Sequence, residues 1–259
     1  MSKTIVVGDT HGRPLWKIPF YNEKWDHFIF IGDYFDTHDN ITPIEQLHNF
    51  KEIMAAKVEM EEKGKVVDCL IGNHDFHYFP EIGYNGTSGY QSGAAKNFEF
   101  AIQENKDKLK MATFVDDVLF THAGVGESWM ERLVKKGYID KLPNFTAAEV
   151  AAWVNQAWEE RWCSKDSGRP YNVFNFTGRH SSGDDMGQTP IWIRPLSLSK
   201  DTHEMRKTIK QVVGHTGQYE LWLDDDRTLK GRYYFTDTLG TSGEYLIIED
   251  GKFSVGKTK

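Results

Sequence analysis

Cysteine is scarce in this chain of 259 residues, and the chain lacks both long apolar runs and clusters of basic residues. The two cysteines, Cys69 and Cys163, have neither zinc-binding nor redox spacing, so we expect reduced thiols rather than a disulfide. No apolar run reaches the roughly 18 residues that a membrane span needs, and the N-terminus shows no signal-peptide pattern. We therefore predict a cytoplasmic protein that does not contact a membrane.

The formal net charge is −7 at pH 7, and no block of lysine and arginine occurs. This balance argues against binding to a nucleic-acid backbone as the main function. A hydrophobic content of 39% fits a globular protein with a sizeable core. Without repeats or linkers, we predict a single domain over residues 1–259, with a helical and loop excursion at about 126–190. Its aperiodic part, residues 164–190, could be a functional loop or equally a surface excursion.

Three apolar segments in the first third of the chain each indicate a short strand that ends in a loop. Their sequences are KTIVVGDTHG, DHFIFIGDYFD and KVVDCLIGNHDF. A helix is predicted between the second and the third, because apolar residues recur there at helical spacing, namely Ile44, Leu47, Phe50, Met54 and Val58. Thr42 and Glu45 form a capping box at its start, and Gly64 suits its C-terminal end. These elements make a strand–helix–strand unit.

Further along, MATFVDDVLFTHAGV indicates a hairpin around residues 116–117 that ends in a histidine loop. A helix is expected over ESWMERLVKKG. Another is expected over FTAAEVAAWVNQAWEERW, where Thr146 and Glu149 form a capping box. The segment IKQVVGHTG indicates a strand and a loop. The last residues alternate apolar and polar side chains around a turn at 250–251, as antiparallel strands do.

Five loops present potential metal ligands directly after an apolar segment. The candidate groups are Asp9, His11, Asp33, Asp36, Asn73, His74, Asp75, His122 and His215. A single histidine after a strand is usually structural, but five such loops are hard to explain by coincidence. In an α/β sheet the carboxyl ends of the strands meet at one edge, where the sites of such folds lie. Carboxylate, imidazole and amide donors without a thiolate suit manganese, iron, zinc or magnesium.

In chain order, these loops form five sequence blocks: Asp-x-His, Gly-Asp-x-x-Asp, Gly-Asn-His-Asp, His and Gly-His. The ordered set, within residues 4–250, resembles the calcineurin-like metallophosphoesterase superfamily. Because the last block is Gly-His-Thr and not Gly-His-x-His, the chain is similar to the phosphoprotein phosphatase branch, which includes phage and bacterial members and the diadenosine tetraphosphatases. The resemblance implies an α/β fold, a four-layer α/β/β/α sandwich with two mixed sheets and the site along one edge.

The same resemblance implies an enzyme with two divalent metal ions, manganese first and iron, zinc, magnesium or nickel as alternatives. The implied ligands are Asp9 and His11 for the first ion, Asp33 as a bridge, and Asn73, His122 and His215 for the second. His74 would be the general acid that protonates the leaving alkoxide, and Asp36 would orient its imidazole. The implied reaction is hydrolysis of a phosphomonoester by direct attack of a metal-bridging hydroxide.

The chain departs from the phosphoprotein phosphatase pattern where the phosphate would bind. Those enzymes usually have Arg-Gly after the second aspartate, whereas this chain has Thr37 and His38 there. The segment IWIRP is similar to the Trp-x-Arg of the phage and bacterial members, so Arg194 is our candidate phosphate anchor. It could instead be an edge-strand arginine in a surface ion pair. We expect the remaining histidines to be surface or packing residues, although His38 and His77 lie within three residues of proposed site groups.

The expected partner is a phosphorylated substrate, either a phosphoprotein side chain or a small phosphorylated metabolite. An alternative is a nucleotide hydrolase that acts on dinucleoside polyphosphates or phosphodiesters, because Gly-Asn-His-Asp resembles the corresponding block of the diadenosine tetraphosphatases. A third hypothesis is a non-catalytic scaffold with the same fold. The presence of every proposed metal ligand argues against it.

Overall fold

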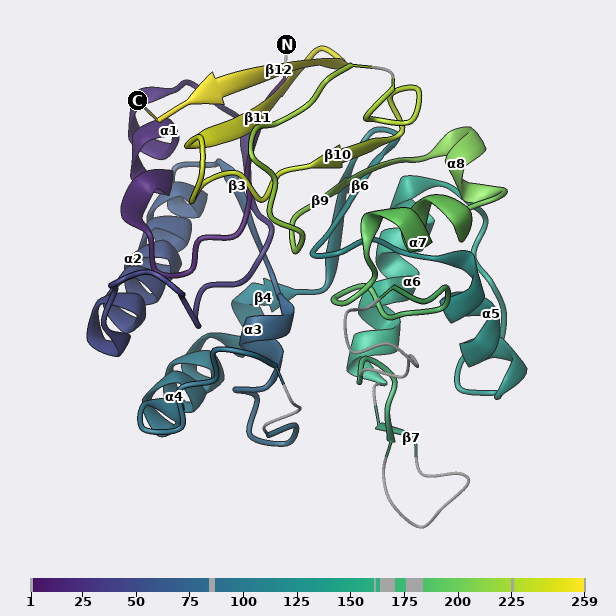
Figure 1. Ribbon diagram of the computed structural model, residues 1–259, viewed down its shortest axis with the longest axis horizontal. Helices are drawn as coiled ribbons and strands as arrows, with labels where there is room; N and C mark the ends of the chain where they lie inside the picture. Colours follow the sequence, from purple (N-terminus) through teal and green to yellow (C-terminus); the bar gives the residue numbers. More distant parts are fainter. Residues whose placement is uncertain are drawn as a thin grey trace. The chain divides into compact units, whose positions relative to one another are not determined.

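The computed structural model describes residues 2–83, 87–160, 162–163, 171–175, 184–224 and 226–258. The chain divides into two compact units (Figure 1). Unit 1 comprises residues 1–110, 217–223 and 235–259, and unit 2 comprises residues 111–216 and 224–234. A single domain over residues 1–259 stays a prediction. Much of the expected loop at 164–190 lies outside the described residues.

Unit 1 contains a six-stranded mixed sheet with the strand order β12-β11-β1-β2-β3-β4. Its strands are β1 (Lys3–Val7), β2 (His27–Phe30), β3 (Val66–Leu70), β4 (Leu109–Lys110), β11 (Glu244–Glu249) and β12 (Lys252–Lys257). The pairs among β1 to β4 are parallel, whereas β11 pairs antiparallel with both β1 and β12. Val7 lies opposite Phe30, and Phe30 opposite Cys69, so β1, β2 and β3 end at the same edge of the sheet. The loops that follow these strands therefore begin side by side.

The central strands of this sheet are apolar on both faces, as is usual for parallel strands that are covered on both sides. Ile5, Val6, Phe28, Ile29 and Val67 have no exposed surface. The helices of unit 1 are η1 (Pro14–Trp16), α1 (Lys17–Asn22), α2 (Pro43–Glu62), α3 (Asn73–Phe76), α4 (Ala95–Asn105) and η2 (Lys106–Lys108). Helix α2 contacts β3 and α4, so the predicted strand–helix–strand unit is present.

Helix α2 starts as the sequence predicts. Thr42 N donates to Glu45 Oε2 at 2.7 Å, and Glu45 N donates to Thr42 Oγ1 at 3.3 Å, which completes the capping box. The predicted apolar face of α2 was wrong at its first and last residues, because Ile44 is 79% exposed and Val58 is 38% exposed.

The buried face of α2 takes in polar residues instead. Gln46 accepts a hydrogen bond from Asp36 N at 2.9 Å, and Asn49 accepts one from Trp16 Nε1 at 2.9 Å. These bonds satisfy buried N–H groups, which apolar side chains in the same places could not do. Hydrophobic periodicity alone does not predict such positions.

Unit 2 contains a mixed sheet with the order β10-β9-β6-β5. The strands are β5 (Ala112–Val115), β6 (Val118–Thr121), β9 (Lys210–Val213) and β10 (Tyr233–Phe235), and a separate ribbon pairs β7 (Trp162–Cys163) with β8 (Tyr171–Asn172). The helices are α5 (Glu127–Lys135), α6 (Ala147–Glu159), α7 (Pro195–Lys200) and α8 (Met205–Thr208). Strand β6 is antiparallel to β5 and parallel to β9, and α6 contacts both β5 and β6.

Two predicted hairpins are confirmed, one between β5 and β6 and one between β11 and β12. Asp250 and Gly251 both have positive φ, 49° and 73°, as a tight hairpin turn requires. The capping box of α6 is only half formed. Thr146 Oγ1 accepts from Glu149 N at 3.3 Å, but the Glu149 carboxylate accepts from Asn144 N at 3.0 Å.

Two mixed sheets with flanking helices confirm the predicted α/β class. Among the described residues, no helix is both long enough and apolar enough to cross a membrane.

Candidate functional site

Three loops meet at the carboxyl edge of the sheet in unit 1, after β1, β2 and β3. The first two are joined by a hydrogen bond of 2.7 Å from His11 N to Asp33 O. The second and third approach so closely that a Cβ on Gly72 would lie 2.0 Å from Asp33 Oδ1. Glycine is therefore needed before Asn73, where the sequence places the Gly-Asn-His-Asp block.

Several residues of these loops have backbone angles that only glycine adopts easily. The φ angles are 44° at His11, 53° at Asp33 and 61° at Asp36. The left-handed region costs a non-glycine residue roughly 1–3 kcal/mol, and such residues cluster at functional sites. The chain turns sharply here, directly after buried strands.

Asp75 holds this conformation in place. Its carboxylate accepts hydrogen bonds from Asp33 N at 2.8 Å, Tyr34 N at 2.7 Å and Gly72 N at 2.9 Å. The side chain has no exposed surface. The sequence groups Asp75 with the potential ligands, but the structure shows that it ties two loops together. Its place three residues after Gly72, the N-cap of α3, is the sequence signal for this role.

Asp9, His11 and Asp33 form a set of metal-type donors. Asp9 and Asp33 are each 1% exposed, and carboxylate oxygens of the two lie within 4.8 Å of each other. His11 Nε2 lies 3.7 Å from Asp33 Oδ2. Two buried carboxylates repel each other unless a cation lies near them, so this donor set fits a divalent metal ion.

His11, the histidine of this set, is in the neutral form that can bind a metal ion. Burial lowers the pKa of His11 to about 4, because desolvation disfavours the imidazolium ion more than Asp33 favours it. Nδ1 lies 2.7 Å from the carbonyl oxygen of Phe35, which can only accept, so Nδ1 carries the proton. The lone pair of the neutral ring is then on Nε2, the nitrogen nearer Asp33.

His74 and Asn73 follow on the third loop. Asn73 is 1% exposed and is the first residue of α3. His74 N donates to Asp33 Oδ1 at 2.9 Å, and His74 Nδ1 lies 3.3 Å from Asp36 Oδ2. The structure therefore brings the predicted acid, its predicted orienting carboxylate and Asp33 together.

The electrostatics of this pair favour a charged imidazole beside a charged carboxylate. Burial opposes ionisation of Asp36, but contacts from His74, His77 and Tyr78 outweigh it and lower the pKa of the carboxyl. Burial likewise opposes a charged His74. The carboxylates of Asp33 and Asp36 reverse that effect and raise the pKa of the imidazole.

Sequence reasoning assigned no role to two neighbours of Asp36. His77 Nε2 lies 2.7 Å from Asp36 Oδ2, and Tyr78 Oη donates to Asp36 Oδ1 at 2.5 Å. The sequence singled out His77 as an exception among the remaining histidines, because it lies within three residues of proposed site groups, but it did not predict this contact with Asp36. His38 is exposed, as expected.

In unit 2, the two predicted histidine ligands lie next to each other. His122 follows β6 and His215 follows the parallel strand β9, and Gly214 N donates to His122 O at 2.8 Å. The ring centroids are 5.2 Å apart. His215 Nε2 lies 3.1 Å from the carbonyl oxygen of Trp192, so Nε2 carries a proton and the lone pair of the neutral ring is on Nδ1.

Arg194, the predicted phosphate anchor, lies beside His215. Its Nη1 donates to His215 O at 3.2 Å and to Thr216 Oγ1 at 3.0 Å. The side chain belongs to the loop that precedes α7 and is half-buried. Its role as an anchor stays a prediction. Arg179, another arginine that could bind the phosphate in its place, lies outside the described residues.

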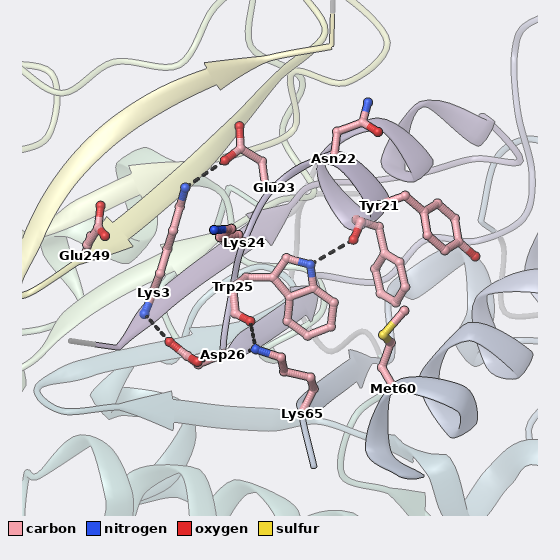
Figure 2. Close-up of a pocket in the computed structure, with 11 residues that line it drawn as sticks. Lys3, Tyr21, Asn22, Glu23, Lys24, Trp25, Asp26, Met60, Lys65 and Glu249 are labelled. Atoms are coloured by element: carbon pink, nitrogen blue, oxygen red, sulfur yellow. Dashed lines mark hydrogen bonds and ion pairs between the residues drawn. The ribbon is translucent and has the colours of Figure 1, made fainter. Parts of the chain in front are cut away.

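A concave region of about 800 Å³ in unit 1 lies at the opposite edge of the same sheet (Figure 2). It surrounds Lys3, Asp26 and Lys65, which stand at or just before the starts of β1, β2 and β3. Its charged groups bond within the region, for example Lys3 Nζ to Glu23 Oε2 at 2.8 Å. The site loops follow the ends of these strands, so we assign this region no part in the chemistry.

Several solved structures are similar to this chain. A cold-active protein tyrosine phosphatase is 18% identical with a TM-score of 0.60, and the match covers 100% of this chain and 77% of that one. A cold-active protein-tyrosine phosphatase of a psychrophilic Shewanella species is 16% identical with a TM-score of 0.55, covering 100% and 78%. A metallophosphoesterase from Sphaerobacter thermophilus is 10% identical with a TM-score of 0.43, covering 100% and 88%.

No curated protein matches the chain in sequence. The profile of the calcineurin-like phosphoesterases matches residues 2–219, which include every loop that carries a predicted site residue. The chain belongs to the calcineurin-like phosphoesterase family and is a phosphoric ester hydrolase.

Proposed function

We propose that the protein is a two-metal phosphatase that hydrolyses phosphomonoesters. One observation carries this proposal: the His74–Asp36 pair lies beside the buried carboxylate of Asp33, with which His74 N is hydrogen-bonded at 2.9 Å. A structural metal site needs no acid–base pair. A buried imidazole held by a carboxylate next to metal-type donors suits proton transfer to a leaving group.

The proposed metal ligands are the six residues that the family resemblance implies. They are Asp9, His11, Asp33, Asn73, His122 and His215, and Asp33 would be shared between two ions. Oxygen and imidazole donors suit manganese, which we prefer, and also iron, zinc, magnesium or nickel. When bound, such ions supply an activated water and neutralise charge on the phosphoryl group.

The chain's own residues would handle the proton and the orientation of the substrate. His74 Nδ1 is directed at Asp36, so Nε2 is the atom that can give a proton to the leaving oxygen. The raised pKa of His74 keeps that proton available. Arg194 would bind the phosphoryl oxygens with its planar guanidinium, in place of the arginine that is missing after Asp36.

For the substrate, we propose a phosphorylated protein side chain or a small phosphorylated metabolite. Two of the solved structures that are similar to this chain are described as protein tyrosine phosphatases, which favours an aromatic phosphomonoester among the candidates. The main alternative is a dinucleoside polyphosphate or a phosphodiester, and a scaffold without activity is a minor one. A cytoplasmic location stays a prediction.

A substrate panel tests this proposal. Protein stripped with a chelator and reloaded with manganese would be assayed against a phosphotyrosine peptide, a phosphoserine peptide, diadenosine tetraphosphate and bis-p-nitrophenyl phosphate. We expect the highest kcat/KM on a phosphomonoester and no turnover before reloading. A clear preference for diadenosine tetraphosphate or the diester would support the alternative, and no turnover on any substrate would support the scaffold.

A further inference from the structure

The carboxylate of Asp36 is surrounded by side chains on both of its oxygens. Oδ2 lies 3.3 Å from His74 Nδ1 and 2.7 Å from His77 Nε2. Oδ1 accepts a hydrogen bond of 2.5 Å from Tyr78 Oη. Asp36 and His77 have no exposed side-chain surface, and Tyr78 is 2% exposed, so water hardly competes for these contacts.

Tyr78 belongs to a closed circuit of hydrogen bonds that returns to Asp36. Gln91 N donates to Tyr78 Oη at 3.0 Å, and Gln91 Nε2 donates to Gln46 Oε1 at 2.9 Å. The same Gln46 Oε1 accepts from Asp36 N at 2.9 Å. One hydrogen-bond network thus holds both the backbone N–H and the carboxylate of Asp36, in addition to the contact between Asp36 and His74.

The phenol of Tyr78 can only act as the donor toward Asp36. Burial raises the pKa of Tyr78, and the hydrogen bond to the Asp36 carboxylate raises it further, so the hydroxyl keeps its proton. The ring is also held by packing, since it stacks on Tyr90 with centroids 5.3 Å apart and meets Phe98 edge-on at 5.0 Å. Its hydroxyl therefore has one fixed direction.

We propose that Tyr78 is a positioning residue that acts on the reaction through Asp36. Its hydroxyl holds Oδ1, so that Oδ2 stays directed at His74 Nδ1 and the ring presents Nε2–H to the substrate. The attacking water oxygen forms a bond to phosphorus as the bond from phosphorus to the leaving oxygen breaks. The electron pair of the broken bond stays on the leaving oxygen, and the Nε2 proton of His74 neutralises it. This role rests on the proposed function, in which His74 is the general acid.

Tyr78→Phe is the direct test, because it removes one oxygen and keeps the ring. We expect kcat on glycerol phosphate to fall about 10-fold to 100-fold, the same order as the loss of an outer hydrogen-bond partner at a metal site, with KM and metal content nearly unchanged. The loss should be smaller on p-nitrophenyl phosphate, whose leaving group needs little protonation. Tyr245→Phe is the matched control, because it removes a hydroxyl bonded to Glu23 at 3.2 Å, and it should leave both activities unchanged.

A double variant separates positioning from a general structural effect. In an Asp36→Ala background, Tyr78→Phe should cause no further loss of kcat, because its partner is already gone. Full additivity of the two losses, or equal losses on the two substrates, would overturn the proposal.

A measurement without metal or substrate keeps this inference distinct from the proposed function. In the metal-free protein, the His74 Nδ1–H signal, assigned with His74→Asn, should be a downfield and slowly exchanging proton resonance. Tyr78→Phe should shift it upfield or broaden it, and Tyr245→Phe should not. An unchanged signal in Tyr78→Phe would overturn the positioning role. An inactive wild-type protein with a signal that depends on Tyr78 would overturn the proposed function alone.

Discussion

At the scale of single residues, His74 is the side chain on which the proposed chemistry depends most. Its Nδ1 faces Asp36 at 3.3 Å, which leaves Nε2 for the leaving group. We expect His74→Asn to retain wild-type metal content while turnover on alkyl phosphates falls roughly 10²–10⁴-fold, the usual contribution of a positioned general acid. Steady-state kinetics would show a smaller loss on p-nitrophenyl phosphate. Equal losses on both substrates would mean that His74 is not the acid.

Variants of Arg194 test whether this residue binds the phosphate in place of the arginine that is missing after Asp36. Lysine keeps the charge but cannot reproduce the two parallel hydrogen bonds of a guanidinium. Arg194→Lys and Arg194→Ala should therefore each lose at least about tenfold in kcat/KM, or about 1.4 kcal/mol, with unchanged metal content. The exposed Arg206 offers a control, because Arg206→Lys should have no effect. A structure with bound phosphate in which Arg194 faces solvent would refute the assignment.

At the scale of elements, the site depends on the loops that follow β1, β2 and β3. Asp75 ties two of these loops through three backbone N–H groups. Asp75→Ala leaves these buried donors unpaired, so we expect a loss of roughly 2–5 kcal/mol in the free energy of unfolding, measured with urea. Asp107→Ala, at an exposed aspartate of unit 1, should change it by less than about 0.5 kcal/mol. A small effect of Asp75→Ala would mean that the loops are held by other contacts.

Elements and loops differ in how far the sequence predicts them. Apolar strands, the cap at Thr42 and the turn at 250–251 follow from local patterns, and these predictions are confirmed. The contacts around Asp36 could not be predicted from local patterns. Tyr78, and Gln91 bonded to it, come close to Asp36 only when the loops fold. Helix α2 shows the same limit, because Ile44 is exposed while the polar Gln46 is buried and accepts a hydrogen bond from Asp36 N.

At the scale of the whole molecule, one carboxylate links distant segments of unit 1 and makes its stability depend on pH. Glu244 in β11 accepts from Leu221 N at 2.7 Å and pairs with Lys257 Nζ at 3.0 Å. Burial would raise the pKa of Glu244, but these partners lower it below its usual value of 4.5. The carboxylate therefore stabilises the fold above about pH 4.5, and this contribution is lost as the pH falls through the lower, folded pKa.

Glu244→Gln tests this linkage. We expect it to lower the free energy of unfolding at pH 7 by about 1–2 kcal/mol and to differ less and less from wild type as the pH falls below 4.5. Glu249→Gln, at an exposed residue of the same strand, is the control. A difference between Glu244→Gln and wild type that stays constant down to pH 2 would contradict the assigned pKa direction.

The central claim for the whole molecule is that each chain binds two divalent ions that share Asp33. Elemental analysis of manganese-loaded, desalted protein tests it most directly. We predict two ions per chain in the wild type. Asp33→Asn should reduce occupancy of both sites, because a bridging carboxylate neutralises charge between two cations. Fewer than one ion per loaded wild-type chain, or an Asp33→Asn protein that still binds two, would contradict the claim.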